Sequence, residues 1–270
     1  MPDLHFLHLS DIHYCENYAN KGIGTILSGL RHPGANVADC LRKEKQKDLD
    51  FVLLTGDLTQ EGDEKDFKQL RNLIEKELGG LPMYSVPGNH DPREAYYKGF
   101  LAMEPPMVPD LCFHHKGLRI IALDSGHGIQ GLIKPSQLEW LTEILKTPSE
   151  RGTLLALHHP LLPDQEGLGT ADCPSCFKEL VLKSDVIGIY TGHTHHNLAA
   201  HFAGKPYFTA GSMAYALRSE EGYATFEGIA TYSRFSLCEN SLTAQVRLAA
   251  PVPSVVARLS MDKLSQLFTE

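Results

Sequence analysis

A chain of 270 residues is long enough to enclose one large hydrophobic core. Hydrophobic residues make up 42% of the chain and charged residues 21%, a balance that excludes wholesale disorder. The 25 basic and 33 acidic residues give a net charge of −8, which argues against mainly electrostatic binding to nucleic acid or anionic lipid. Histidine is frequent, with 14 residues, and many lie in clusters that indicate metal or acid–base chemistry.

The sequence predicts no segment that crosses a membrane, because no stretch of 18 consecutive apolar residues is present. Residues 1–9 lack a basic region, a long apolar stretch and a small-residue cleavage site, so we expect a cytoplasmic protein. In that compartment the cysteines are expected to be reduced thiols. Cys173 and Cys176 form one CxxC motif without a second pair, and the sequence assigns it no role.

Short apolar runs rich in Val, Ile and Leu predict strands that are buried on both faces. These runs are Leu4–Leu9, Phe51–Thr55, Met83–Val86, Leu118–Leu123, Thr153–Leu157 and Val186–Tyr190. Helical patterns lie between them at Ala35–Asp48, Glu64–Leu78, Arg93–Leu101, Ser136–Lys146 and Cys173–Lys183. The alternation of strands with helices predicts an α/β sheet covered by helices on both faces.

The pattern changes near Pro206, where the segments alternate between apolar and polar residues and no helical pattern separates them. We expect antiparallel strands at Pro206–Ala210, Tyr223–Ala230, Arg234–Cys238 and Leu242–Leu248. Apolar residues at near-helical spacing predict a C-terminal helical tail over residues 251–270. Because we find no internal repeat or linker, we expect one domain over residues 1–270, with a core from about residue 3 to about residue 250.

Five short polar motifs each follow directly on a predicted strand. They are Asp11-Ile12-His13, Gly56-Asp57, Gly88-Asn89-His90-Asp91, His158-His159-Pro160 and Gly192-His193-Thr194-His195. Ligands of open α/β sheets bind beyond the carboxyl ends of the strands. We therefore expect the five motifs to converge in space, although about 185 residues separate the first from the last.

The residue types in these motifs suit metal binding. Asp11 and His13 are two residues apart, as are His193 and His195, so each pair projects to one side of an extended backbone. Carboxylate, amide and imidazole ligands favour first-row transition metals, and one bridging carboxylate makes the set large enough for two ions. One such motif alone is usually structural, so the prediction rests on all five together. The histidines outside the motifs are expected to be structural or solvated: His5, His8, His32, His114, His115, His127 and His201.

The order of the motifs, D-x-H, G-D, G-N-H-D, H-x-P and G-H-x-H, resembles that of the calcineurin-like metallophosphoesterase superfamily. It looks most similar to the bacterial class III cyclic-nucleotide and glycerophosphodiester phosphodiesterases. The resemblance spans Asp11 to His195 and implies a four-layer αββα sandwich of mixed β-sheets. One departure is Leu161 after Pro160, where relatives often have a second proline.

The resemblance also implies two metal ions per chain, iron and/or manganese, with zinc as a further candidate. Asp11, His13 and His195 would hold the first metal; Asn89, His158 and His193 would hold the second; Asp57 would bridge both. His90 would be the catalytic residue, as an acid or a charge stabiliser at the substrate phosphate. His159 would be a neighbour of the site and not a ligand.

By the same resemblance, the chain would be a metal-dependent phosphodiesterase of small phosphodiesters, cyclic nucleotides such as cAMP first. In-line attack by a metal-bridging hydroxide would cleave the ester. The alternatives are a phosphomonoesterase or glycerophosphodiesterase with the same centre and, more distantly, a non-catalytic interaction module on this scaffold. We expect a small phosphoester as the partner, without membrane or nucleic acid, and the sequence leaves a homodimer and the natural substrate open.

Overall fold

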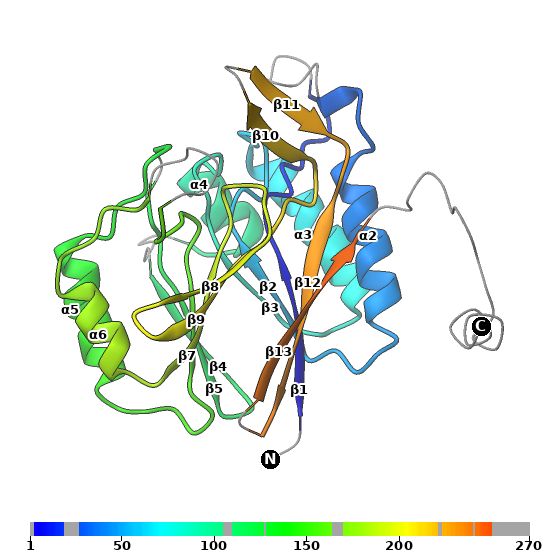
Figure 1. Cartoon of the computed structure of the whole chain (residues 1–270). Coiled ribbons are helices and arrows are strands. Elements are labelled where there is room, and N and C mark those ends of the chain that lie inside the picture. Colours follow the sequence, from blue (N-terminus) through cyan, green and yellow to red (C-terminus); the bar gives the residue numbers. More distant parts are fainter. Residues whose placement is uncertain are drawn as a thin grey trace, which may run out of the picture.

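The computed structural model describes residues 3–18, 27–104, 110–126, 128–163, 170–220, 223–239 and 241–249. Two β-sheets pack face to face in it, and helices cover the outer surface of each sheet (Figure 1). This arrangement is the four-layer αββα sandwich that the family resemblance implies, whereas the expectation of one sheet with helices on both faces is wrong, because the inner face of each sheet packs against the other sheet. The predicted C-terminal tail, 251–270, lies outside the described residues.

The first sheet has five strands and mixes parallel with antiparallel pairs. Its order is β13 (Ser241–Leu248), β12 (Thr231–Cys238), β1 (Leu4–Leu9), β2 (Phe51–Thr55) and β3 (Met83–Val86). The pairs β1–β2 and β2–β3 are parallel, whereas β12 runs antiparallel to both β1 and β13. The carboxyl ends of β1, β2 and β3 therefore meet at one edge of the sheet.

The second sheet has six strands and is mixed in the same way. Its order is β4 (Leu111–His115), β5 (Leu118–Ala122), β6 (Thr153–Ala156), β7 (Val186–Thr191), β9 (Lys205–Thr209) and β8 (Leu198–Phe202). The strands β5, β6, β7 and β9 are parallel, and β4 and β8 are the antiparallel edges. A separate hairpin pairs β10 (Ala216–Glu220) with β11 (Tyr223–Glu227).

Three of the predicted helices and strands need correction. The single helix expected over Arg93–Leu101 is instead the short α4 (Arg93–Ala95) followed by the π-helix η1 (Tyr96–Phe100). The expectation that the segment after Pro206 is wholly antiparallel is wrong, since β9 pairs in parallel with β7. The helix expected over Cys173–Lys183 begins only at Phe177, as α6 (Phe177–Lys183). The strands β4, β8 and β10 were not predicted, because short half-polar segments carry a weak periodic pattern.

Helices on the outer faces complete the four layers. The first sheet is covered by α2 (Pro33–Glu44), α3 (Glu64–Leu78), α4 (Arg93–Ala95) and the π-helix η1 (Tyr96–Phe100); α5 (Pro135–Leu145) and α6 lie outside the second sheet (Figure 1). The helix α3 has the predicted bounds. Asp63 caps its N-terminus through the amides of Lys65 and Asp66, and Gly79 ends it in a left-handed conformation.

The core between the two sheets is rich in aromatic residues. The Phe6 ring stacks on Phe51, with centroids 4.7 Å apart, and on Phe235 at 5.1 Å. Tyr190 of the second sheet meets the ring of Phe235 edge-on at 5.1 Å. Each such pair contributes about 0.5–1.5 kcal/mol beyond the burial of its area. This layer therefore fixes how the two sheets lie on each other.

Candidate active site

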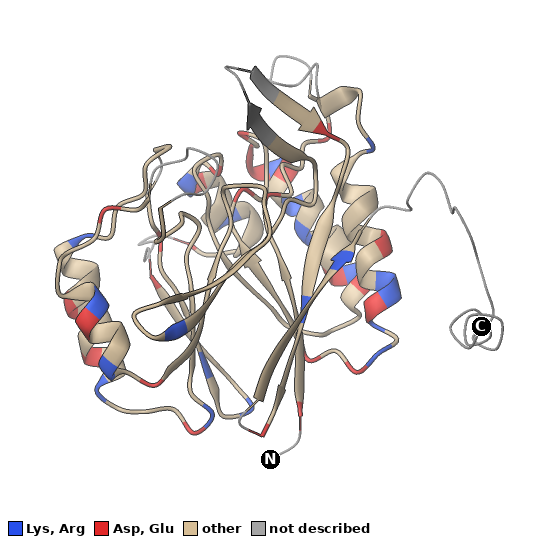
Figure 2. Ribbon diagram, viewed as in Figure 1, with Lys and Arg blue, Asp and Glu red and all other residues tan. Residues whose placement is uncertain are grey.

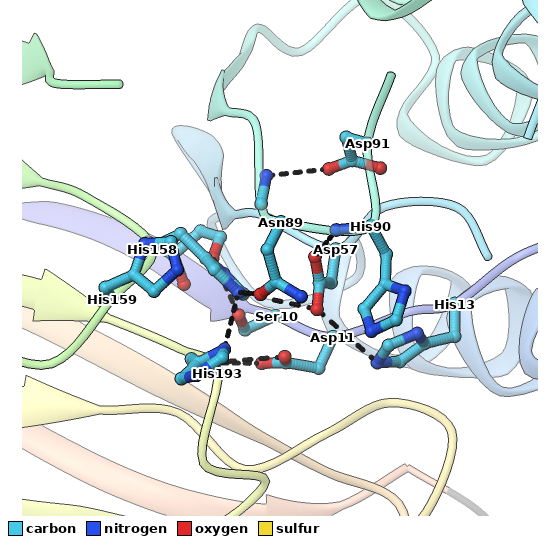
Figure 3. Close-up of polar contacts among 12 residues, drawn as sticks. Ser10, Asp11, His13, Asp57, Asn89, His90, Asp91, His158, His159 and His193 are labelled. Atoms are coloured by element: carbon cyan, nitrogen blue, oxygen red, sulfur yellow. Dashed lines mark hydrogen bonds and ion pairs between the residues drawn. The ribbon is translucent and has the colours of Figure 1, made fainter. Parts of the chain in front are cut away.

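The five predicted motifs meet at the carboxyl ends of strands from both sheets (Figure 3). The loops after β1, β2 and β3 supply Asp11, His13, Asp57 and Asn89, and those after β6 and β7 supply His158, His193 and His195. All of these side chains are buried except that of Asn89, which is half-buried. The predicted convergence of the motifs is confirmed, and the site lies across the junction of the two sheets.

One group of possible metal ligands consists of Asp11, His13 and His195, whose ligand atoms lie within 4.8 Å of one another. The Nε2 atoms of His13 and His195 are 3.0 Å apart. The Nε2 atom of His195 is also 3.4 Å from Oδ1 of Asp11. Three donors from two sheets thus surround one small volume.

A second group consists of Asp57, His158 and His193, again within 4.8 Å. Nε2 of His158 lies 3.4 Å from Oδ2 of Asp57, 3.2 Å from Nδ1 of His193 and 3.0 Å from Oδ1 of Asn89. The same Asp57 oxygen is 3.8 Å from Nε2 of His13. Asp57 therefore lies between the two groups, where a bridging ligand would have to be.

The hydrogen bonds of the ring nitrogens that point away from the site indicate that the two ligand groups suit cations. Nδ1 of His158 lies 2.8 Å from the carbonyl oxygen of Thr55, and Nδ1 of His195 lies 2.9 Å from that of Tyr215. A carbonyl oxygen only accepts, so both Nδ1 atoms carry hydrogen and, in the neutral rings, the Nε2 lone pairs face inward. These lone pairs repel one another and the carboxylate unless a cation lies between them. In metal sites, a carbonyl oxygen that accepts from the other ring nitrogen commonly fixes a ligand imidazole in this orientation.

The electrostatics of the second group favour positive charge. Burial alone would lower the pKa of His158, but the carboxylates of Asp57 and Asp11 outweigh burial and raise it to about 9. Burial lowers the pKa of His13 to about 3, since its carboxylate partners compensate less. The negative potential around Asp57 is therefore strong enough to hold a cation beside His158.

Strained backbone aims the ligand candidates into the site. Five residues have the left-handed φ angles that side chains other than glycine rarely adopt: Asp11 (51°), His13 (49°), Asp57 (48°), His193 (73°) and His195 (60°). Each such conformation costs on the order of 1–3 kcal/mol and persists only where the surroundings enforce it. Strain of this kind clusters at functional sites, which supports a functional role for this cluster.

Tight loops hold these strained residues in place. A Cβ atom on Gly88 would lie 2.1 Å from the backbone nitrogen of Asp57, so this position requires glycine. The buried carboxylate of Asp91 accepts hydrogen bonds from the amides of Leu58, Thr59 and Gly88 at 3.0, 2.9 and 2.8 Å. Asp91 thus ties the loop after β2 to the loop after β3.

Arg93 braces the same loop from the other side, a role the sequence did not indicate. Its guanidinium donates to both carboxylate oxygens of Asp124 at 2.8 and 2.7 Å, and to the carbonyl oxygens of Gly88 and Asp91 at 2.6 and 2.7 Å. Asp124 follows β5, so this contact connects the loops of the two sheets. The planar fork of arginine suits such a bidentate contact.

His90 lies beside the two groups and not between them (Figure 3). Its ring centroid is 5.2 Å from that of His13, and its amide donates to Asp57 at 2.8 Å. The side chain is 33% exposed, so substrate can reach it. Its ring also lies close enough to His13 and Asp57 to form a third possible ligand group with them.

His159 is buried next to the site but belongs to none of the ligand groups. Its Nδ1 is 2.8 Å from the hydroxyl of Ser125, and its Nε2 is 2.8 Å from the carbonyl oxygen of Gly128. Of the histidines expected to be structural, His8 lies inside β1 and bonds to Thr55 at 2.8 Å, whereas His127 lies outside the described residues. Burial lowers the pKa of His8 to about 3, so that ring is neutral.

The charge distribution agrees with a small-molecule site. Lys and Arg residues are interspersed with Asp and Glu along the described helices, and many form ion pairs one turn apart, such as Lys68–Glu64 and Lys183–Glu179 (Figure 2).

In the part of the chain that the structure describes, no helix is long and apolar enough to span a bilayer.

Similarity to known proteins shows that the chain is a metal-dependent hydrolase of phosphoric esters. Residues 4–197 match the family model described as calcineurin-like phosphoesterase, and the chain belongs to this family. It is 35% identical to the cAMP/cGMP dual specificity phosphodiesterase of Mycobacterium tuberculosis over 234 residues, which cover 79% of this chain and 69% of the relative. It is 34% identical to a probable cyclic nucleotide phosphodiesterase of Rhodococcus erythropolis over 229 residues, 78% of this chain and 71% of the relative.

The fold is shared more widely than the sequence. The structure of GAP50, titled the anchor in the inner membrane complex of Plasmodium, superposes with a TM-score of 0.64 at 13% identity. The match covers 92% of this chain and 85% of that one. At this identity the likeness shows the fold alone. The family implies a dinuclear metal centre, for which the two ligand groups described above provide the candidate residues.

Proposed function

We propose that the chain is a dinuclear metallophosphodiesterase that hydrolyses small phosphodiesters, with 3′,5′-cyclic nucleotides as the first candidates. The observation that carries this proposal is the pair of buried ligand groups with Asp57 between them. The names of the Mycobacterium and Rhodococcus relatives support the substrate class. The interspersed surface charges favour a small substrate over a nucleic acid polymer.

The proposed ligands divide into two sets that share one carboxylate. The first set is Asp11, His13 and His195, the second is Asn89, His158 and His193, and Asp57 belongs to both. Imidazole and carboxylate donors fit iron or manganese, and also zinc. When bound, two such ions lower the pKa of water to about 7 and neutralise charge on the phosphate oxygens.

The side chains around the ligands have separate tasks in this proposal. His90, which is partly exposed and adjoins the ligand Asn89, acts on the leaving oxygen of the ester as an acid or a charge-stabilising hydrogen-bond donor. Arg93 and Asp91 hold the loop that carries both residues, through their hydrogen bonds to its backbone. The rigid loop keeps His90 in reach of the leaving group while the ester is cleaved.

A substrate panel with manganese-loaded protein tests the proposal. The panel contains 3′,5′- and 2′,3′-cyclic nucleotides, glycerophosphodiesters, bis(p-nitrophenyl) phosphate and p-nitrophenyl phosphate. We expect kcat/KM for at least one cyclic nucleotide to exceed that for the monoester at least about tenfold, which corresponds to about 1.4 kcal/mol. Asp57→Ala should abolish turnover, and Asp39→Ala on the exposed face of α2 should not.

The other outcomes would replace the proposal with a specific alternative. Preference for the monoester would make the protein a phosphomonoesterase. Preference for glycerophosphodiesters would keep the chemistry and change the substrate. Metal-loaded protein that turns over nothing in the panel would indicate a non-catalytic module.

A further inference from the structure

The side-chain amide of Gln60 lies between the rings of His13 and His90. Its Oε1 is 2.8 Å from Nδ1 of His13, and its Nε2 is 3.3 Å from Nδ1 of His90. Gln60 is 2% exposed, and its backbone amide donates to the carbonyl oxygen of Tyr14 at 3.0 Å. The next amide, that of Glu61, donates to the carbonyl oxygen of His90 at 3.1 Å. The side-chain amide of Gln60 therefore contacts both histidine rings, and the backbone around it is fixed by hydrogen bonds to Tyr14 and His90.

The orientation of this amide follows from His13. Nε2 of His13 faces the ligand groups, at 3.0 Å from Nε2 of His195 and 3.8 Å from Asp57. As a metal ligand this nitrogen offers its lone pair, so the hydrogen of the neutral ring is on Nδ1. That N–H requires an acceptor, which is Oε1 of Gln60. The NH₂ group of Gln60 must then point toward His90.

The same reasoning determines which nitrogen of His90 carries hydrogen. An NH₂ group only donates, so Nδ1 of His90 accepts and the hydrogen of the neutral ring is on Nε2. We propose that Gln60 is a positioning residue that holds His90 as the Nε2–H tautomer. This inference rests on the proposed function, in which Nε2–H of His90 donates a hydrogen bond to the leaving oxygen as negative charge develops there.

A carboxylate at this place would have the opposite effect, because it accepts hydrogen bonds and draws the proton of His90 to Nδ1. Glu61 is the nearest carboxylate, with Oε1 3.7 Å from Nδ1 of His90. That separation exceeds a hydrogen-bond distance, and the Glu61 side chain is 58% exposed, so solvent screens it. The buried amide of Gln60 is therefore the contact that decides the tautomer.

Nuclear magnetic resonance of zinc-loaded protein with 15N-labelled histidine tests the tautomer directly. The His90 ring is identified by the signals that vanish in His90→Asn. At a pH at which the ring is neutral, we expect its hydrogen on Nε2 in the wild type and in Glu61→Gln. In Gln60→Glu we expect Nδ1 of His90 to become protonated while two zinc ions remain, because a carboxylate still accepts from His13.

Kinetics with saturating manganese test what the tautomer does. In Gln60→Met we expect kcat for a substrate with an alkoxide leaving group to fall at least about tenfold more than kcat for bis(p-nitrophenyl) phosphate, since phenolate leaves without a proton. Gln69→Met, at a half-buried glutamine of α3, is the matched control and should change neither value.

Two results would overturn the inference. One is a wild-type His90 ring with hydrogen on Nδ1. The other is an equal loss of kcat for both substrates in Gln60→Met. If no phosphodiester is turned over at all, the proposed function fails instead, and the NMR spectrum alone then decides the tautomer.

Discussion

The backbone amide of His193 donates to both carboxylate oxygens of Asp11, at 3.1 and 3.0 Å. Asp11 follows β1 in the first sheet and His193 follows β7 in the second, 182 residues later. Both residues have left-handed backbone conformations. The contact therefore joins the two halves of the site through one carboxylate, which is also a candidate metal ligand.

Asp57→Ala is expected to lose most of both metals, whereas Asp11→Ala mainly empties one position. The reason is that Asp57 lies between the two ligand groups, while Asp11 belongs to one. Metal content by mass spectrometry of protein purified with manganese measures the difference, with Asp39→Ala as the control. Two metal equivalents retained in Asp57→Ala would show that Asp57 is not the bridge.

His158→Asn should lose metal and activity, whereas His159→Asn should keep both. His158 directs Nε2 at Asp57 and Asn89, but His159 uses both ring nitrogens for Ser125 and Gly128. The His159 variant should instead lose about 1–3 kcal/mol of unfolding free energy, because it leaves buried polar partners unsatisfied. Metal analysis and urea unfolding test this pair. Equal metal loss in both variants would mean that the assigned ligand is wrong.

His90→Ala should retain both metals and lose about 10²–10⁴-fold in kcat, the range for a positioned acid. The loss should be larger for a ribose or glycerol alkoxide than for p-nitrophenolate, since only the alkoxide needs a proton. Parallel kinetics on the two substrates measure it. Equal losses would favour charge stabilisation by His90, and a missing metal would make it a ligand, as its proximity to His13 and Asp57 allows.

A buried carboxylate far from the site makes a stability prediction. Glu44 ends α2 and is fully buried, and its oxygens accept from Tyr232, Arg234 and Arg247 at 2.9, 3.3 and 2.6 Å. Burial would raise the pKa of Glu44, but hydrogen bonds from Lys47, Tyr232 and Arg247 outweigh it and lower the pKa below 4.5. The folded state thus binds this proton less readily than the unfolded chain does.

The sign of the pH effect follows from this lowered pKa. The stabilisation by Glu44 is present above pH 4.5 and is lost as the pH falls through the lower folded value. Glu44→Gln should destabilise the protein by about 3 kcal/mol near neutral pH, because it leaves the buried Arg234 and the half-buried Arg247 without their anion. The difference from wild type should shrink as the pH falls. Urea unfolding at several pH values measures it, and Glu75→Gln on exposed α3 should cost less than about 1 kcal/mol.

The sequence could predict those parts of the site whose positions depend only on neighbouring residues in the chain. Strand ends are local, so Asp11, Asp57 and His158 could be placed together from their position after apolar runs. The partners that orient them depend on sheet packing. Tyr215, whose carbonyl accepts from His195, follows no pattern that marks it, and Arg93 meets Asp124 only because the two sheets adjoin.

The helices show the same limit. The bounds of α3 follow from its apolar spacing and its Asp63 cap, both local features. The helix expected over Arg93–Leu101 is instead one α-turn followed by η1, which packs against α3 where a Cβ atom on Gly99 would lie 2.6 Å from the carbonyl oxygen of Glu64. That contact is tertiary, so the periodicity of the segment does not reveal it.

The aromatic layer between the sheets has a consequence for metal selectivity. One sheet carries Asp11, His13, Asp57 and Asn89, and the other carries His158, His193 and His195, so the gap between the sheets contributes to each distance between ligand candidates of different sheets. A metal site requires its ligands within about 0.2 Å of their usual distances from the ion. Protein interiors are close-packed and transmit small displacements. The rings of Phe6, Phe51 and Phe235 thus help to set the distances between the ligand candidates of the two sheets, on which the choice of ion would depend.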